Sequence, residues 1–158
     1  MQKCNCEMPH FAKNNKGAEL YWRLRNISYE RMLVVNDMLS EYDLHYAQPP
    51  VLGVIQHHKS ATQKELADYM NTSAAAMSAT LKRMQKAGLV EKTQDKEDTR
   101  VNKITLTAKG EKTHEETFEK TMNIDRKMLD GFKEEEIEQL FTYLDRIHTN
   151  IENMGKEK

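Results

Sequence analysis

The chain has 158 residues, of which 38% are hydrophobic and 31% are charged, with 6 glycines and 3 prolines. This composition predicts a helix-rich globular chain and excludes an intrinsically disordered one. No run approaches the roughly 18 apolar residues that a membrane span needs, and the first residues lack the apolar stretch of a secretory signal. We therefore expect a cytoplasmic protein.

Charge is distributed unevenly along the chain, although the net charge is only −1. Residues 59–109 carry ten Lys and Arg against six Asp and Glu, a net of +4, whereas the two flanks carry fourteen against nineteen, a net of −5. A basic segment between acidic ends is a weak indication of nucleic-acid binding, because ordinary solvated surfaces also carry such segments.

Residues 1–16 are polar and irregular, which predicts a flexible arm ahead of a single domain at 17–158. Cys4, Cys6 and His10 in this arm supply thiolate and imidazole groups that could bind a metal or sense oxidation. Cys-x-Cys is a poor spacing for a disulfide. We favour an incidental exposed pair over a sensor.

The first half of the chain predicts two helices. Apolar residues recur at helical spacing between Gly17 and Leu44, which indicates a long helix with a broad apolar face. Gln48-Pro49-Pro50 ends that pattern and begins a short helix that reaches about His57, because proline is tolerated in a first helical turn.

Two more short helices follow, each with a recognisable start. Thr62-Gln63-Lys64-Glu65 has the spacing of a capping box and predicts the first of them. The turn Asn71-Thr72-Ser73 precedes the second, which runs from Ser73 to about Lys86 and is ended by Gly88.

The remainder predicts a β-wing and two long helices. Leu89–Lys92 and Val101–Leu106 read as short strands joined by a charged loop. Thr107 caps a helix that extends to about residue 130, and Gly131 interrupts it. A last helix over 133–154 carries apolar residues at alternating steps of three and four, as in a coiled-coil seam. The fold class is therefore mainly α with a two-stranded β-wing.

The order of elements between residues 49 and 106 is typical of a winged helix-turn-helix. In the helix over 73–86, Met77, Leu81 and Met84 share one face and would anchor the core. The opposite face is small, polar or cationic, so it fits a major groove roughly 12 Å wide. A solvated surface helix has the same pattern, so this helix alone does not decide the function.

At these residues the sequence resembles the multiple antibiotic resistance regulator (MarR) family of bacterial transcription factors. The resemblance covers roughly residues 20–154 and is most specific at Thr62–Ala67, Ser78–Val90, Asp95–Arg100 and Leu106–Gly110. It implies a homodimer formed by the N- and C-terminal helices, about 17–44 and 107–154. It also implies a pseudo-palindromic duplex DNA target, bound by a winged region at about 48–107, and most often repression.

The resemblance also implies roles for individual residues. It places Arg100 in the minor groove of DNA, held by Asp98, where a narrow A·T-rich groove attracts a guanidinium. A plain surface ion pair is the alternative for these two. The full set of expected DNA-binding residues is Thr62, Gln63, Ser73, Ala75, Ser78, Ala79, Lys82, Arg83, Lys96, Asp98, Arg100 and Lys103.

Two departures from the family pattern keep a second function open. Many members carry basic residues at the positions of Ala79 and Thr99, so we expect modest DNA affinity, with thymine methyl contacts from Ala75 and Ala79. The alternative is a winged-helix module that binds protein, or an anti-repressor, without strong DNA binding. No enzyme is expected, because the chain has no phosphate loop, nucleophile–base pattern or metal-ligand motif.

The resemblance further implies a small-molecule, redox or metal signal. The residues that could line an effector pocket are Trp22, Tyr29, Met32, Met38, Tyr42, His45 and Tyr46, and packing in the core or an interface is the favoured alternative. Metal sensing has no support, since adjacent His57 and His58 would diverge on a helix. We predict no cofactor.

Overall fold

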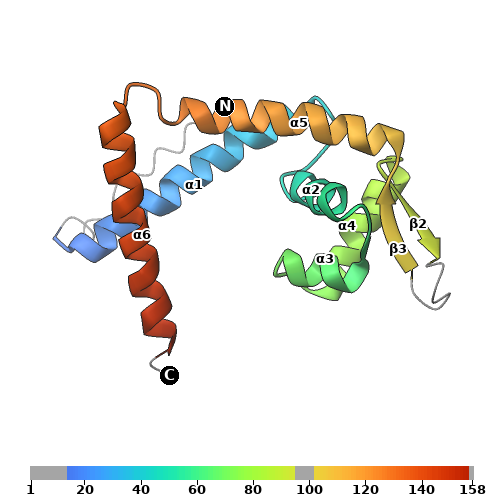
Figure 1. The fold of residues 1–158 in the computed structure, drawn as a ribbon, viewed down its shortest axis with the longest axis horizontal. Coiled ribbons are helices and arrows are strands. Elements are labelled where there is room, and N and C mark those ends of the chain that lie inside the picture. The colour runs from blue at the N-terminus through green and yellow to red at the C-terminus, as the bar shows by residue number, and fades with distance from the viewer. Residues whose placement is uncertain (1–13, 95–101, 157–158) are drawn as a thin grey trace. The chain divides into compact units, whose positions relative to one another are not determined.

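The computed structural model describes residues 14–94 and 102–156 and is mostly helical (Figure 1). Apart from one additional short strand, its helices and strands follow the order predicted from the sequence, and the described chain divides after Thr121 into two compact units. No helix in these described ranges is long and apolar enough to cross a membrane. The elements are α1 (Lys16–Ser40), α2 (Gln48–His58), β1 (Ala61–Thr62), α3 (Gln63–Tyr69), α4 (Ala74–Lys86), β2 (Val90–Gln94), β3 (Asn102–Leu106), α5 (Ala108–Lys127) and α6 (Glu134–Lys156).

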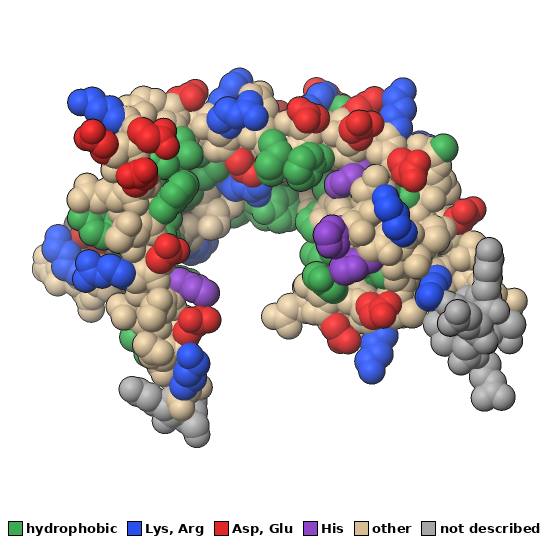
Figure 2. All heavy atoms as spheres, viewed as in Figure 1, with side chains coloured by type: hydrophobic (Ala, Val, Ile, Leu, Met, Phe, Trp, Pro, Cys, Tyr) green, Lys and Arg blue, Asp and Glu red, His purple; other side chains and the backbone are tan. Residues whose placement is uncertain are grey.

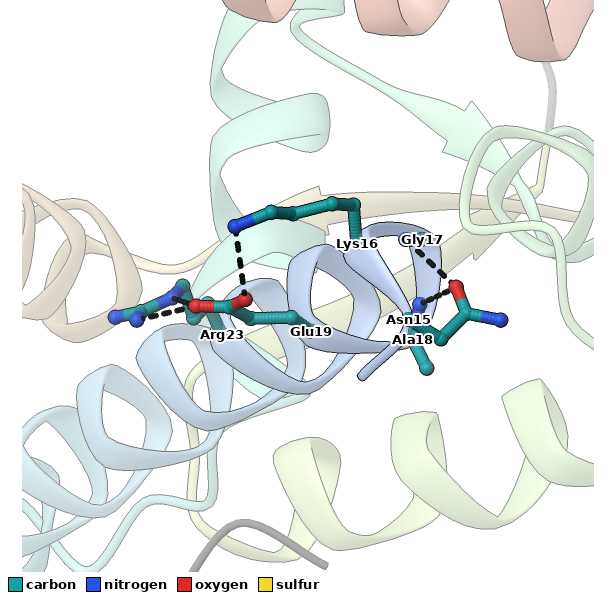
Figure 3. A network of polar contacts seen from close by, with 6 residues as sticks. All are labelled: Asn15, Lys16, Gly17, Ala18, Glu19 and Arg23. Atoms are coloured by element: carbon teal, nitrogen blue, oxygen red, sulfur yellow. Dashed lines mark hydrogen bonds and ion pairs between the residues drawn. The ribbon is translucent and has the colours of Figure 1, made fainter. Parts of the chain in front are cut away.

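Helix α1 begins at a well-formed cap and ends earlier than its apolar pattern suggests. The Asn15 side chain accepts hydrogen bonds from the backbone N–H groups of Gly17 and Ala18, at 2.9 and 3.1 Å (Figure 3). The hydrogen bond from Arg23, with the charges of Lys16 and Arg23, holds the pKa of the Glu19 carboxyl below its usual 4.5.

The far end of α1 corrects the predicted boundary at Leu44. The helix stops at Ser40, and Asp43 then adopts a left-handed conformation with φ 55°. The chain turns back so that Leu44 N–H donates to the Leu39 carbonyl at 3.1 Å. Leu39 and Leu44 are both buried. Because the reversal buries Leu44, the apolar pattern of α1 continues past the end of the helix.

The core of the first unit surrounds α2 and the two short helices that follow it. Met77, Leu81 and Met84, the face of α4 predicted to anchor the core, are buried. Val51, Leu52 and Ile55 on α2 and Leu66 on α3 are buried beside them. Burial of this apolar surface is the main stabilising term for the unit.

The sheet has three antiparallel strands in the order β1-β3-β2, one more than the predicted two-stranded wing. Strand β1 pairs Ala61 with Ile104, and β2 pairs Val90 with Leu106. Ala61 and Ile104 are buried, so β1 joins the base of the wing to the start of α3. A strand of two residues shows no alternation, and for this reason the sequence pattern did not reveal it.

Thr62 and Glu65 form the predicted capping box at the start of α3. The Thr62 hydroxyl accepts from Glu65 N–H at 3.2 Å, and the Glu65 carboxylate accepts from Thr62 N–H at 2.7 Å. These bonds hold the pKa of Glu65 below its usual 4.5. The box therefore stabilises the fold fully above about pH 4.5, and its contribution is lost as the pH falls through the lowered pKa.

Loss of this cap has a measurable cost. Thr62→Ala is expected to lower the free energy of unfolding by about 1 kcal/mol, because an N-terminal amide of α3 loses its acceptor. Thr72→Ala, in the exposed turn after α3, is the matched control and is expected to change stability by less than about 0.5 kcal/mol. Urea denaturation checks both, and equal effects of the two substitutions would refute the role of the cap.

The end of α4 is joined tightly to the start of α5 by the Leu-Thr-x-x-Gly segment. Gly88 follows α4 with φ 71°, a conformation that favours glycine. The Thr107 hydroxyl donates to the Gly88 carbonyl at 2.6 Å and accepts from Gly110 N–H at 3.0 Å. Thr107 N–H donates to the Leu89 carbonyl at 3.1 Å. One threonine thus caps α5 and fixes the residue that ends α4.

The second unit is the C-terminal part of α5 and helix α6, with Gly131 at φ 88° in the turn between them. The described residues of α6 include none that is buried. Its apolar seam is half-buried or exposed in the single chain, and the exposed large apolar residues of this unit are Met122, Met128, Phe132, Phe141, Tyr143, Leu144, Ile151 and Met154.

Candidate nucleic-acid interface

Helices α3 and α4 form a helix-turn-helix whose second helix has one buried and one exposed face. In the turn, Asn71 adopts φ 46° and Thr72 N–H donates to the Ala67 carbonyl at 2.9 Å. The Ser73 hydroxyl caps α4 by accepting from Ala76 N–H at 3.2 Å. The α4 residues Ala75, Ala79, Lys82 and Arg83 are exposed and Ser78 is half-buried, so the small and cationic face predicted for a DNA groove points outward.

A groove runs beside this face, between the start of α3, the flank of α4 and the sheet. Its volume is about 360 Å³, and its lining residues are Thr62, Gln63, Lys64, Ser78, Leu81, Lys82, Gln85, Lys92, Asn102 and Ile104. Three lysines and no carboxylate line it. We call this the lysine groove.

The lysines of the groove have no acidic partner in the part of the chain that the structure describes. Within the described ranges, neither Lys64, Lys82 nor Lys92 forms an ion pair with a carboxylate. Three ammonium groups around one groove repel each other and attract anions, and phosphodiester oxygens are the anions that a DNA strand presents in a row. The lysine groove therefore has the charge and the amide groups, from Gln85 and Asn102, to hold a nucleic-acid backbone.

The predicted DNA-binding residues divide into three groups. Thr62, Gln63, Ser78 and Lys82 line the lysine groove. Ser73, Ala75, Ala79 and Arg83 are exposed on or before α4, outside that groove, and Lys103 is half-buried on β3. Lys96, Asp98 and Arg100 lie outside the described residues.

Two of these residues have internal roles as well. The Thr62 hydroxyl bonds with Glu65, and the Gln63 side-chain amide donates to the Ala74 carbonyl at 3.3 Å, linking α3 to the first turn of α4. Sequence reasoning did not identify Lys64, Gln85, Lys92 or Asn102, because a tertiary groove and not a sequence spacing brings them together. The basic surplus of residues 59–109 was the one signal that included the lysines.

A second hollow, the α1–α2–α5 cavity, has a volume of about 330 Å³. Its lining residues are Arg31, Val35, Tyr46, Pro49, Pro50, Gly53, His114, Thr117, Phe118 and Thr121. On the face seen in Figure 2, hydrophobic and histidine side chains lie next to each other where α2 and α5 meet.

Of the seven residues predicted for an effector pocket, Tyr46 lines this cavity. Trp22, Met32, Met38 and Tyr42 are half-buried, and Tyr29 and His45 are exposed; within the described chain, all six lie outside the lining. Most of the cavity lining comes instead from residues of α2 and α5. No local pattern indicates these residues, since they approach α1 only in the folded chain.

Hydrogen bonds hold the wall of the cavity that Tyr46 forms. Arg31 Nη1 donates to the Tyr46 hydroxyl at 2.9 Å, and Tyr46 N–H donates to Asn36 Oδ1 at 3.0 Å. The buried Gln48 accepts from His45 N–H at 2.8 Å. The connection between α1 and α2 is thereby tied to both helices.

Helix α5 is attached to the same connection by Lys120. Its ammonium group lies 2.7 Å from a Glu41 carboxylate oxygen and 4.8 Å from the centre of the Tyr42 ring. The hydrogen bond to Glu41 raises the pKa of Lys120 above its usual range. These contacts place His114, Thr117 and Phe118 of α5 against the cavity.

The described residues contain no group of three His, Cys, Asp or Glu side chains arranged to hold a metal ion. His57 and His58 pack edge to face, and His58 Nε2 lies 3.1 Å from the Tyr69 hydroxyl. Cys4, Cys6 and His10 lie outside the described residues, so the redox and metal hypotheses for the arm stay predictions.

Comparison with known proteins places this geometry in a family. The sequence model described as MarR family matches residues 42–101. The uncharacterized HTH-type transcriptional regulator YwoH of Bacillus subtilis is 31% identical over 112 residues, which are 71% of this chain and 80% of YwoH. The chain belongs to the MarR family. It is accordingly a helix-turn-helix transcriptional regulator and not an enzyme.

Solved structures agree with this assignment. The structure of a MarR family protein from Bacillus stearothermophilus is 27% identical, with a TM-score of 0.72 over 86% of this chain and 95% of that one. The MepR–DNA complex from Staphylococcus aureus is 23% identical, with a TM-score of 0.71 over 83% of this chain and 95% of MepR. The second comparison supports the MarR fold alone.

Proposed function

We propose that this MarR-family regulator binds duplex DNA as a homodimer, with α4 in the major groove and one phosphate strand in the lysine groove. The observation that carries the proposal is a set of three lysines beside the exposed face of α4 that form no ion pair with any carboxylate of the described residues. The solved MepR–DNA complex, of similar fold, supports it. Arg100 of the wing would enter the adjacent minor groove, held by Asp98, as the family resemblance implies, and Lys96 is a further DNA-binding residue of the same wing.

The homodimer is proposed from the apolar seam of the second unit. Large apolar side chains such as Phe141, Ile151 and Met154 are 50%, 60% and 66% exposed in the single chain. An apolar stripe at coiled-coil spacing is covered when a second helix packs on it. A two-fold symmetric dimer would present two copies of α4 to half-sites about one helical turn apart. Sedimentation of the full chain at micromolar concentration should give twice the monomer mass.

A small molecule in the α1–α2–α5 cavity is proposed to relieve repression. Helix α5 lines the cavity through His114 and Thr117, and its first turn holds the end of α4 through Thr107 and Gly110. A ligand that shifts α5 would therefore move the C-terminal end of α4. Such a shift changes the spacing of the two copies of α4 and weakens DNA binding.

Selection of bound fragments from the host genome tests the proposed function. The intact protein is expected to enrich a pseudo-palindrome, and the double variant Lys82→Ala and Arg83→Ala is expected to lose the enrichment while it stays folded and dimeric. Lys112→Ala, on the surface of α5, is the control and should enrich the same sequence. Absence of enrichment by a folded wild-type dimer would favour the protein-binding module instead.

A further inference from the structure

His114 is a half-buried histidine in the cavity wall whose ring nitrogens form no hydrogen bond within the described chain. Its Cε1 lies 3.5 Å from the position that a Cβ on Gly53 would occupy, and its ring centre lies 5.8 Å from that of Phe118. The imidazole therefore lies between Gly53 of α2 and Phe118 of its own helix. Its polar atoms are left for water or for a ligand.

Few ionisable groups face this imidazole. Helix α1 contributes Arg31, the α1–α2 connection contributes the Tyr46 hydroxyl, and the α2 residues of the lining, Pro49, Pro50 and Gly53, have no ionisable side chain. Burial lowers the pKa of His114 below its usual 6.5, against the opposing charge of Glu115 on the same helix. Burial therefore favours the neutral imidazole in the free protein.

The remaining lining sets the shape and chemistry of a ligand. Val35, Pro49, Pro50 and Phe118 present apolar surface, which suits a compact apolar body. The Tyr46 hydroxyl accepts a hydrogen bond from Arg31 and so keeps its own proton to donate. A neutral imidazole donates one hydrogen bond, whereas an imidazolium donates two and carries a charge that stabilises an anion.

We propose that His114 couples ligand binding in this cavity to the uptake of one proton, with an apolar ligand that carries a single negative charge. The proton passes from solvent to a ring nitrogen of His114, and no covalent bond to the ligand forms. The inference rests on the proposed effector role of the cavity and adds a pH dependence to it.

Linkage gives the direction of the effect. An anion held against His114 raises the pKa of the imidazole in the complex, so affinity increases as the pH falls toward and below that raised pKa. Above it the imidazole is neutral in both states and affinity is constant. A neutral ligand of the same shape has no such preference, because it does not favour the imidazolium.

The test is calorimetric titration of the intact protein with 2-naphthoate and with its neutral counterpart 2-naphthamide, at pH 5.5 and pH 7.5. Naphthoate is expected to bind about tenfold more tightly at pH 5.5, a change that a shift of one pKa unit produces. Titrations in two buffers of different ionisation enthalpy should show a net uptake of protons, largest where the pH lies between the pKa values of His114 in the free and the bound protein. Naphthamide should bind equally at both values of pH.

Two variants assign the effect to the residue. His114→Gln keeps a polar side chain of similar size and should bind naphthoate with no dependence on pH. His45→Gln, an exposed histidine outside the lining, should behave as the wild type does. Absence of naphthoate binding, binding independent of pH in the wild type, or the same pH dependence in His114→Gln would overturn the inference.

Operator release, measured in the same solutions, separates this inference from the function proposed above. Proton-coupled binding of naphthoate without release of DNA would refute the effector role but support the role of His114. Release of DNA by naphthoate with equal affinity at both values of pH would refute the role of His114 alone.

Discussion

Replacement of Gly110 by alanine is expected to lower the free energy of unfolding by about 2–3 kcal/mol, as overpacking at a rigid contact does. A Cβ at this position would overlap the Leu89 carbonyl oxygen and lie 2.9 Å from the Leu89 carbonyl carbon. The clash is with backbone, and Leu89 is itself held by a hydrogen bond from Thr107 and by its own bond to the Met84 carbonyl. Neither helix can yield without loss of these bonds.

Gly155→Ala is the matched control for this substitution. Gly155 is also helical, but a Cβ there meets nothing within 4 Å. Alanine is the better helix former by up to about 1 kcal/mol, so this variant should be unchanged or slightly more stable. Urea denaturation followed by circular dichroism compares the two. Equal stability of Gly110→Ala and the wild type would mean that α4 and α5 are not joined as closely as described.

Removal of the three charges of the lysine groove should weaken DNA binding about a hundredfold per bound subunit at physiological salt. The triple variant Lys64→Gln, Lys82→Gln and Lys92→Gln loses three ammonium groups that have no acidic partner in the described chain, so no carboxylate is left unpaired. Each lost phosphate contact should reduce the slope of log affinity against log salt by about 0.9. The loss should be the same for operator and for unrelated duplexes, because phosphates carry no sequence information.

Lys112 on α5 provides a control for the same Lys→Gln change outside the groove. Its Nζ lies 3.8 Å from Oε1 of Glu116 on an exposed surface. Lys112→Gln should leave both the DNA affinity and the slope of log affinity against log salt unchanged. Fluorescence anisotropy of a labelled duplex across a series of salt concentrations measures both quantities. A triple variant with the wild-type slope would place the phosphate strand elsewhere on the protein.

Local sequence signals predicted the elements of the fold well, because short-range chemistry determines where most of them start and stop. The capping box of Thr62 and Glu65, the stop at Gly88 and the interruption at Gly131 lie where the sequence indicated. The end of α1 was placed too late, since Leu44 is buried by a chain reversal that its apolar character does not distinguish from a further helical turn.

The candidate sites were less predictable, because tertiary packing assembles them. The exposed face of α4 follows from helical periodicity, and Lys82 was identified for this reason. Lys92 reaches the same groove from β2 through the strand pairing of the sheet. The cavity shows the same limit: Tyr46 was predicted, whereas His114 comes from a helix about seventy residues away in the sequence and carries no local signal.

Lysine acetylation of the wild-type protein, with and without a selected operator duplex, tests the central claim most directly, since it requires no substitution. Mass spectrometry would report the reactivity of each lysine in the free and bound states. The account predicts that DNA protects Lys64, Lys82 and Lys92 severalfold and leaves Lys112 as reactive as before. If all four lysines are as reactive in the DNA complex as in the free protein, the assignment of the lysine groove and of α4 as the DNA-binding surface is contradicted.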